Sequence, residues 1–469
     1  MSRLFAVLIA RALLGVLLGA AANAYATQNT TVTFTYDAVG NLKTVTNGLS
    51  HTTTYGYDSL SRRTSETDAT ATGITKYDYD GLDQLIKVTD PRNVVTSYTV
   101  NGLGELTQTS SGDTGSTISL YDEAGNLTSR TDAKQQTTTY KYDALNRITL
   151  ITYHDNGTVA YTYDQGPNAI GKLSHVADAS GTIQYYYNAF GQIAAEARTL
   201  GGATHTTFYR YDDTGRLSGM SYPSGRNIEY VRDTLGRISK VTALIGVATT
   251  PVLTDVAYQP FGPVRSVTFG NGRTQERSYD RDGRITSFSL SAQTMGLTYD
   301  AANRIKAITD PATPATGSTY DYDVLDRLTN VATAGSAQTY VYDAVGNRKQ
   351  KVNNSAVTNY AYGAANNRLT QVGAQAIATD VNGSITDKVG ATFNYDARGR
   401  MVSANTAIGL VTYTINSLGQ RVRKVTPTET TVFHYDMAGK LIAESTTVGS
   451  TTTTQEYVYL GDMPVAVLK

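Results

Sequence analysis

A short motif, aromatic-x-Tyr-Asp-x-x-Gly, recurs along this chain about every 21 residues and constrains the fold more than any other feature. Clear copies occupy residues 34–42, 140–148 and 393–400. The aromatic-x-Tyr pair places two rings on the same face of a β-strand, because side chains alternate along a strand. The Asp-x-x-Gly that follows fits a type I turn ending in a residue with positive φ. The motif therefore predicts a strand, a tight turn and a second strand.

The positions that define the repeat are the second aromatic residue, the aspartate and the glycine. In well-preserved copies they are Tyr36, Asp37, Gly40, Tyr57, Asp58, Tyr142, Asp143, Tyr342, Asp343, Gly346, Tyr395, Asp396 and Gly399. We expect the aspartate to accept a backbone N–H inside its turn, and the paired rings to form a packing core.

A second turn is expected after each hairpin, for example at Asn47-Gly48 or at Asp90-Pro91, where the chain returns to the next copy. About twenty copies of two strands and two turns predict an all-β fold. The array is predicted to be continuous over residues 27–469. The motif spacing is irregular near residues 241–257 and 363–396, where we expect an excursion or a change of register.

The first 26 residues have a different character from the array. Arg3 and Arg11 precede an apolar run over residues 12–22. Two overlapping small-x-small motifs follow, one ending at Ala24 and the other at Ala26. This pattern predicts a signal peptide cleaved after Ala24 or Ala26. The competing interpretation, a membrane anchor, has only about 11 uninterrupted apolar residues where about 20 are needed. We expect an exported chain without a transmembrane span after cleavage, located in the periplasm, at the cell surface or outside the cell.

Composition excludes several classes of function. Lys plus Arg number 40 and Asp plus Glu number 40. The chain therefore lacks the basic excess that is typical of nucleic-acid-binding proteins. Cysteine is absent, which excludes disulfides, thiolate metal sites and cysteine nucleophiles. The 34 tyrosines, against 9 phenylalanines, favour β-structure.

Each candidate chemical motif in the chain favours a structural interpretation. The histidines are His51, His154, His175, His205 and His434; none pairs at metal-ligand spacing, and we expect them in solvent or in turns. Residues 166–173 fall short of a phosphate-binding loop and predict a lengthened turn. Asp80 and Asp280 are predicted to be turn aspartates rather than calcium ligands. The sequence thus predicts no enzyme activity, no cofactor and no metal site.

The Tyr-Asp signature, its period and the Gly-(Asn/Arg)-Leu continuation resemble the YD repeats of the Rhs family. That family includes bacterial Rhs polymorphic toxins, the C component of insecticidal Tc toxins and the shell of animal teneurins. The C-terminal residues 433–468 resemble the entry to the Rhs-associated core, which is itself absent from this sequence.

The resemblance implies a β-strip that spirals into a hollow shell, and we expect about twenty repeats to form an incompletely closed one. It also implies a non-catalytic structural role, enclosing or presenting a toxin or effector that is not part of this chain. The expected partner is then such a cargo or a companion chain. The alternative is a stand-alone secreted or surface protein that binds carbohydrate or another cell, with exposed tyrosines stacking on sugar rings.

Overall fold

The computed structural model describes residues 30–260, 262–313 and 316–469, and these residues form a single antiparallel sheet of 42 strands. Each strand pairs with the strands that precede and follow it in the chain. Within the described sheet, β1 (Thr33–Tyr36) pairs with β2 alone and β42 (Met463–Leu468) with β41 alone, so the sheet does not close on itself. The predicted all-β, open architecture is confirmed. The predicted signal peptide, residues 1–26, lies outside the described residues.

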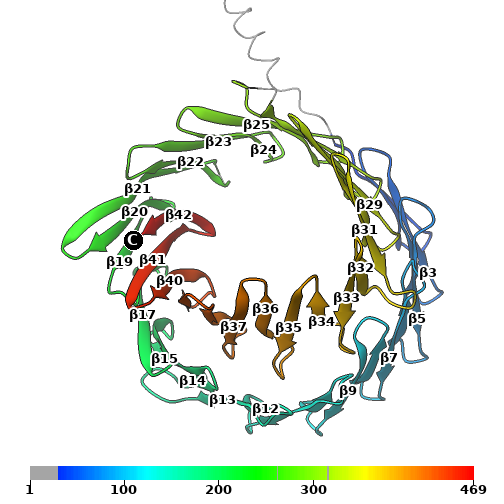
Figure 1. Cartoon of the computed structure of the whole chain (residues 1–469), viewed down its shortest axis with the longest axis horizontal. Helices are drawn as coiled ribbons and strands as arrows, with labels where there is room; N and C mark the ends of the chain where they lie inside the picture. The colour runs from blue at the N-terminus through cyan, green and yellow to red at the C-terminus, as the bar shows by residue number, and fades with distance from the viewer. Residues whose placement is uncertain (1–29, 261, 314–315) are drawn as a thin grey trace, which may run out of the picture.

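The strip winds as a spiral, and we call β1–β24 the first winding and β25–β42 the second (Figure 1). The strands of the first winding are β1 (Thr33–Tyr36), β2 (Leu42–Thr46), β3 (Thr52–Tyr57), β4 (Arg63–Thr67), β5 (Ile74–Tyr79), β6 (Leu85–Thr89), β7 (Val95–Val100), β8 (Leu106–Ser111), β9 (Gly115–Tyr121), β10 (Leu127–Thr131), β11 (Thr137–Tyr142), β12 (Ile148–Thr152), β13 (Thr158–Tyr163), β14 (Leu173–Asp178), β15 (Gly181–Tyr187), β16 (Ile193–Leu200), β17 (Ala203–Tyr211), β18 (Leu217–Ser221), β19 (Asn227–Arg232), β20 (Ile238–Ile245), β21 (Ala248–Tyr258), β22 (Val264–Phe269), β23 (Thr274–Tyr279) and β24 (Ile285–Leu290).

The second winding continues without interruption of the strand order. Its strands are β25 (Gln293–Tyr299), β26 (Ile305–Thr309), β27 (Ser318–Tyr322), β28 (Leu328–Thr333), β29 (Ser336–Tyr342), β30 (Arg348–Asn353), β31 (Ala356–Tyr362), β32 (Leu369–Val372), β33 (Gln375–Thr379), β34 (Ile385–Lys388), β35 (Ala391–Tyr395), β36 (Met401–Thr406), β37 (Gly409–Ile415), β38 (Arg421–Val425), β39 (Thr430–Tyr435), β40 (Leu441–Val448), β41 (Thr451–Leu460) and β42 (Met463–Leu468).

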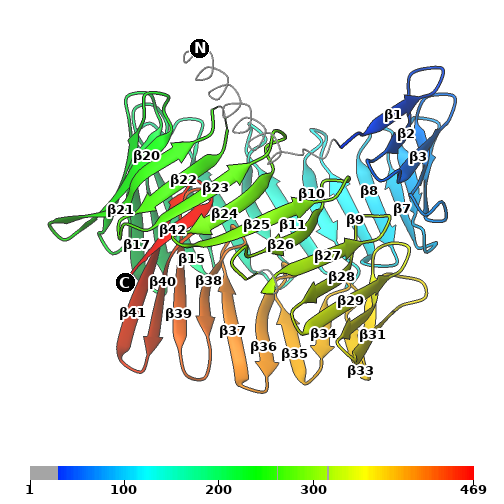
Figure 2. The same ribbon diagram turned by 90° about the horizontal axis from the view of Figure 1, so that it is seen from above.

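Seen from above, the strip descends from the level of β1–β3 through β22–β28 to the level of β34–β41 (Figure 2). The second winding therefore lies along one edge of the first rather than repeating its path. The last strands, β40–β42, lie inside the ring beside β17–β21 (Figure 1). The sheet is thus an open, curved wall whose C-terminal strands lie on its inner side.

A β-bulge recurs next to the motif aspartate and helps to explain the curvature. The register shifts between Thr35 and Tyr36 in the first hairpin, and between Lys141 and Tyr142 in a later one. A bulge inserts an extra residue into one strand, bends it and increases its twist. Because the bulge returns at the same edge of the sheet, its bends accumulate in one direction.

The two stretches with irregular motif spacing differ in strand length. Residues 241–257 belong to the hairpin β20–β21, whose second strand has 11 residues. Residues 363–396 contain the short strands β32 and β34, with 4 residues each. The long hairpin β20–β21 projects beyond the ring (Figure 1).

The largest apolar core forms where the end of the chain meets the first winding. Val458 and Leu460 of β41 and Ile442 of β40 pack with Tyr209 and Ile228 of the first winding. Ile228, Ile442 and Val458 are fully buried. Burying such side chains contributes about 1.5–3 kcal/mol each, so this cluster fixes the inner strands to the wall.

Candidate functional site

The turn that begins at each motif aspartate, here called the Asp turn, is built by the aspartate side chain. In the first copy, Gly40 N donates to Asp37 O at 3.2 Å, and Asp37 N donates to Asn41 O at 2.9 Å. The Asp37 carboxylate accepts from the Val39 and Asn41 amides at 3.0 and 2.9 Å. This is a type I turn followed by a positive-φ residue.

The last position of the Asp turn needs a positive φ, which explains the motif glycine. Gly40, Gly346 and Gly399 have φ of 93°, 91° and 72°. Where glycine is missing, Asn146 takes the position with φ of 58°, as asparagine tolerates this region better than other side chains.

A residue just after the Asp turn joins consecutive repeats along the edge. Arg147 donates through Nε to Asp143 Oδ2 at 2.7 Å and through Nη2 to Asp164 Oδ2, in the next turn, at 2.6 Å. The backbone amide of Arg147, together with its guanidinium, lowers the pKa of Asp143. The same lowering is found for Asp37 and Asp58, where hydrogen bonds outweigh the effect of burial.

The second tyrosine of the motif bridges to the preceding hairpin. The hydroxyl of Tyr142 donates to Leu127 O at 3.0 Å, and that of Tyr57 donates to Leu42 O at 2.9 Å. Tyr342 and Tyr395 make the same bond at 2.8 and 2.7 Å. This tyrosine ladder uses each hydroxyl to hold neighbouring repeats together. Tyr36 lies on the first described strand and is 61% exposed.

The aromatic face of the sheet points into the ring. The tyrosines alternate with exposed residues, as in β11, where Tyr140 and Tyr142 are half-buried and Lys141 is exposed. In the first winding this face carries Tyr209, which packs against β41. Because β41 lies inside the ring, the aromatic face is the inner face (Figure 1).

The windings meet along a seam, which we define as the contact between the turns that connect successive hairpins of the first winding and the Asp turns of the second. We call the first kind return turns. Arg92, in one return turn, donates to Asn366 O at 3.0 Å and to Gly363 O at 2.9 Å, and contacts Asp343 at 3.4 Å. Contacts across the seam join residues from 220 to 277 positions apart.

The seam continues for several hairpins with paired charges and amides. Lys134 contacts Asp380 at 2.5 Å, and Asn382 donates to Asp132 at 2.6 Å. Further along, Arg398 contacts Asp178 at 3.1 Å. The ion pairs are partly shielded from water, which strengthens them relative to surface pairs.

Two contacts between windings anchor the inner strands. Tyr222 donates its hydroxyl to Tyr457 O at 2.7 Å, and Arg226 contacts Glu456 at 3.2 Å. Tyr222 is 2% exposed and Glu456 is fully buried. Removing the arginine would leave a buried carboxylate without a charge partner, which is costly.

The seam residues were not singled out by the sequence interpretation, although a signal was present. The return turns of the first winding that carry Asp90 and Asp132 are closed by hydrogen bonds from Asp90 N to Val94 O and from Asp132 N to Gln136 O. Many return turns of the second winding are tight instead, such as the one between Thr333 and Ser336. The longer turns present a side-chain carboxylate at the edge, where the second winding can reach it.

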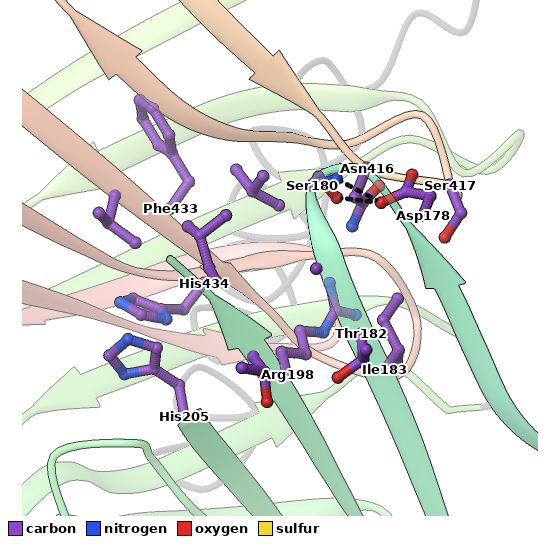
Figure 3. A pocket seen from close by; sticks show the side chains of 15 residues that line it. Asp178, Ser180, Thr182, Ile183, Arg198, His205, Asn416, Ser417, Phe433 and His434 are labelled. Atoms are coloured by element: carbon purple, nitrogen blue, oxygen red, sulfur yellow. Dashed lines mark hydrogen bonds between the residues drawn. The ribbon is translucent and has the colours of Figure 1, made fainter. Parts of the chain in front are cut away.

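A small cavity of about 30 Å³ lies at the seam, between β14–β17 and β37–β39. His205 of β17 and His434 of β39 face each other there, with ring centroids 4.5 Å apart (Figure 3). Asp178 and Arg198 also line it. A cavity of this volume has room for about one water molecule, so it does not suit a larger ligand.

The expectation that the histidines lie in solvent or in turns is wrong for this pair. His434 is 7% exposed and lies within a strand, because the second winding brings it against the first. Burial, then His205 and Arg198, lowers the pKa of His434 to about 4. Burial also lowers the pKa of His205 and raises that of the nearby Glu196 carboxyl.

The remaining sequence motifs fall in turns or strands of the array. Asp90-Pro91 lies in a return turn, and Asp80 and Asp280 open Asp turns. Residues 166–173 form the lengthened turn that was predicted, closed by Asp164 N donating to Lys172 O. Among the described residues, no group of three or more His, Asp or Glu side chains is arranged to hold a metal ion.

An open spiral of tandem hairpins, held by an edge ladder and a seam, defines a repeat shell. Comparison with known families identifies its type. The teneurin YD-shell family matches residues 292–459, and the RHS repeat family matches residues 27–72 and 121–159. The chain is therefore similar to both families, and its tandem hairpins are YD (Rhs) repeats.

Solved structures with the same fold come from Tc toxins. A mutant Tc holotoxin pore of Photorhabdus luminescens superposes with a TM-score of 0.78 at 16% identity, over 92% of this chain and 27% of that one. TcdB2-TccC3-Cdc42 and TcdB2-TccC3 without its hypervariable C-terminal region each give a TM-score of 0.79 at 17% identity. Each alignment covers 92% of this chain and 28% of the other. No curated protein sequence matches the chain.

Within the described residues, no helix combines the length and the apolar character that a membrane crossing requires.

Proposed function

We propose that this chain forms part of the wall of an exported shell that encloses or presents a polypeptide toxin or effector. The observation that carries the proposal is the seam, which joins the windings into one curved wall with its aromatic face inward. In this role the chain acts by surrounding its cargo, and its own side chains perform no chemical step.

The structural neighbours support a role in a larger assembly. This chain spans less than a third of the length of the TcdB2-TccC3 chains that it matches. Their titles pair TcdB2 with TccC3 and mention a hypervariable C-terminal region and Cdc42. We infer that a companion chain or segment completes the shell of the present protein and that the cargo lies outside residues 1–469.

Export is part of the proposal and rests on residues 1–26. Their basic start, short apolar run and small-residue exit are those of a cleaved signal peptide. N-terminal sequencing of the protein secreted or released from a bacterial host should show a start after Ala24 or Ala26. Recovery of the intact N-terminus with the membrane fraction would contradict the proposal.

The enclosure itself can be tested by protection from protease. The chain would be co-expressed with the proteins encoded beside its gene, purified through a tag on the chain, and treated with trypsin. A co-purifying polypeptide that survives until the wall is opened supports the shell. If no polypeptide co-purifies or is protected and the purified chain binds a glycan array, the alternative of a stand-alone carbohydrate-binding protein is favoured.

A further inference from the structure

One Asp turn of the second winding departs from the pattern of the edge ladder. In the other arginine-bearing Asp turns, the arginine four residues after the aspartate binds that aspartate, as Arg304 binds Asp300 at 2.7 Å. In the turn that starts at Asp396, the carboxylate instead pairs with Arg398 at 3.2 Å. Arg400, which stands at the usual position, makes no ion pair within the described chain.

Besides binding Asp396 in its own turn, Arg398 reaches across the seam to the first winding. It contacts Asp178 at 3.1 Å, lies over the ring of Tyr153 at 5.7 Å and is 15% exposed. Arg398 thus pairs with two carboxylates. The guanidinium of Arg400 donates to the Asn416 carbonyl at 2.6 Å and makes no direct ion pair with a described residue.

A cleft of about 490 Å³ opens at this place on the inner face of the seam. Its lining includes Arg130, Tyr140 and Tyr153 from the first winding, and Arg398 and Arg400 from the second. Arg130 pairs in register with Thr138, so it shares the aromatic face with Tyr140. That face points into the ring.

Three polar side chains that line the cleft have no hydrogen-bond partner among the described residues. The side chain of exposed Arg130 makes no hydrogen bond or ion pair within the described residues. The hydroxyls of Tyr140 and Tyr153 likewise make none there, unlike the hydroxyls of the tyrosine ladder. The lining carries three arginines and one carboxylate, that of Asp132, whose oxygens accept from Gln136 N and Asn382. Two guanidinium groups without a direct ion-pair partner, beside tyrosine hydroxyls, suit a carboxylate.

We propose that this cleft binds a carboxylate-bearing segment of an enclosed polypeptide, with Arg130 and Arg400 as the charge partners and Tyr140 and Tyr153 as hydroxyl donors. The assignment to a polypeptide rests on the proposed shell function, because the cleft faces the interior. The site would hold cargo at a fixed place on the wall.

The test uses the purified chain and a fluorescein-labelled hexaglutamate peptide, followed by fluorescence anisotropy at low salt. We expect saturable binding that Arg130→Gln weakens about tenfold, as expected for loss of a charge-assisted contact. Arg265→Gln is the matched control: Arg265 is exposed on β22, next to Val264, on the face opposite to the aromatic one, and should leave binding unchanged. Arg130 makes no contact that folding needs, so its variant should keep its circular dichroism spectrum and melting temperature.

Further measurements separate the alternatives. Equal binding of hexaglutamine would overturn the carboxylate assignment, and absence of hexaglutamate binding would overturn the site. Stronger binding of a tetragalacturonate, lost in Arg130→Gln, would replace the polypeptide by an acidic glycan. A protected cargo that co-purifies equally with wild type and Arg130→Gln would leave the shell intact and reject the anchoring role.

Discussion

Asp178 of the first winding and Arg398 of the second form an ion pair at 3.1 Å across 220 residues of sequence. The carboxylate is 3% exposed and also accepts from the amide of Ser180 at 2.8 Å. This pair joins the end of a first-winding strand to an Asp turn of the second winding. Contacts of this kind hold the two windings together.

The first prediction concerns this ion pair. Asp178→Asn keeps the shape and the acceptor oxygen but leaves Arg398 with one carboxylate partner, Asp396. We expect the free energy of unfolding to fall by about 2 kcal/mol, the value for loss of a hydrogen bond to a charged group, because Arg398 keeps Asp396 as a partner. The urea midpoint measures this change. Asp78→Asn, at an exposed pair with Lys87, should cost less than about 1 kcal/mol. Equal effects of the two variants would mean that the seam contributes little.

The second prediction concerns the tyrosine ladder. Tyr142→Phe removes the hydroxyl that donates to Leu127 O and should cost about 1 kcal/mol, since that carbonyl loses its side-chain donor. Tyr140→Phe, in the same strand, removes a hydroxyl that bonds no described residue and should cost less than about 0.5 kcal/mol. Chemical denaturation of both variants distinguishes the roles. A larger loss for Tyr140→Phe would contradict the role given to the hydroxyl of Tyr142 in the tyrosine ladder.

The third prediction isolates the backbone requirement of the Asp turn. Gly104 has φ of 83° and a Cβ there would meet no atom within 4 Å, so Gly104→Ala tests conformation alone. We expect a loss of about 1–2 kcal/mol, the cost of placing an L side chain in the left-handed region. Gly102→Ala, in the same turn, has equal space and no positive φ, and should change the melting temperature little. Similar melting temperatures for the two variants would contradict the turn assignment.

The fourth prediction is a pH dependence from His434. Its pKa of about 4 in the fold lies below the unfolded value of 6.5, so the unfolded chain binds the extra proton between these values. Above pH 6.5 His434 is neutral in both states, so its burial does not affect the free energy of unfolding through protonation. As the pH drops from 6.5 towards 4, the free energy of unfolding falls by up to about 3 kcal/mol. His205 contributes in the same direction, whereas the raised pKa of Glu196 favours the fold as the pH falls.

His434→Gln separates these contributions, because glutamine stays neutral throughout. The stability difference between wild type and variant should shrink as the pH falls from 7 to 4, while Glu196 acts equally in both proteins. His51→Gln, in a return turn outside the seam cavity, serves as the control. A constant difference between wild type and His434→Gln over this range would show that His434 is not buried as the structure has it.

Much of the local structure followed from the sequence because its causes lie within a few residues. Asp37, Gly40 and Asn41 form their turn through bonds that span at most four positions. The alternation of Tyr140, Lys141 and Tyr142 sets which face each ring takes. Repetition of these short-range rules predicted the all-β fold without reference to distant residues, whereas the open, spiralling sheet was implied by the resemblance to the Rhs family.

The hairpin, its turn and the side on which its rings lie therefore follow from local sequence, whereas the positions at which the windings meet depend on tertiary structure. The seam joins Arg92 to Asn366 and Asp178 to Arg398, and it buries His434 against His205. Those meetings depend on the twist and bend summed over some ten hairpins, about 21 residues each. A small change in each hairpin shifts the partner by whole residues, so no short motif can specify it.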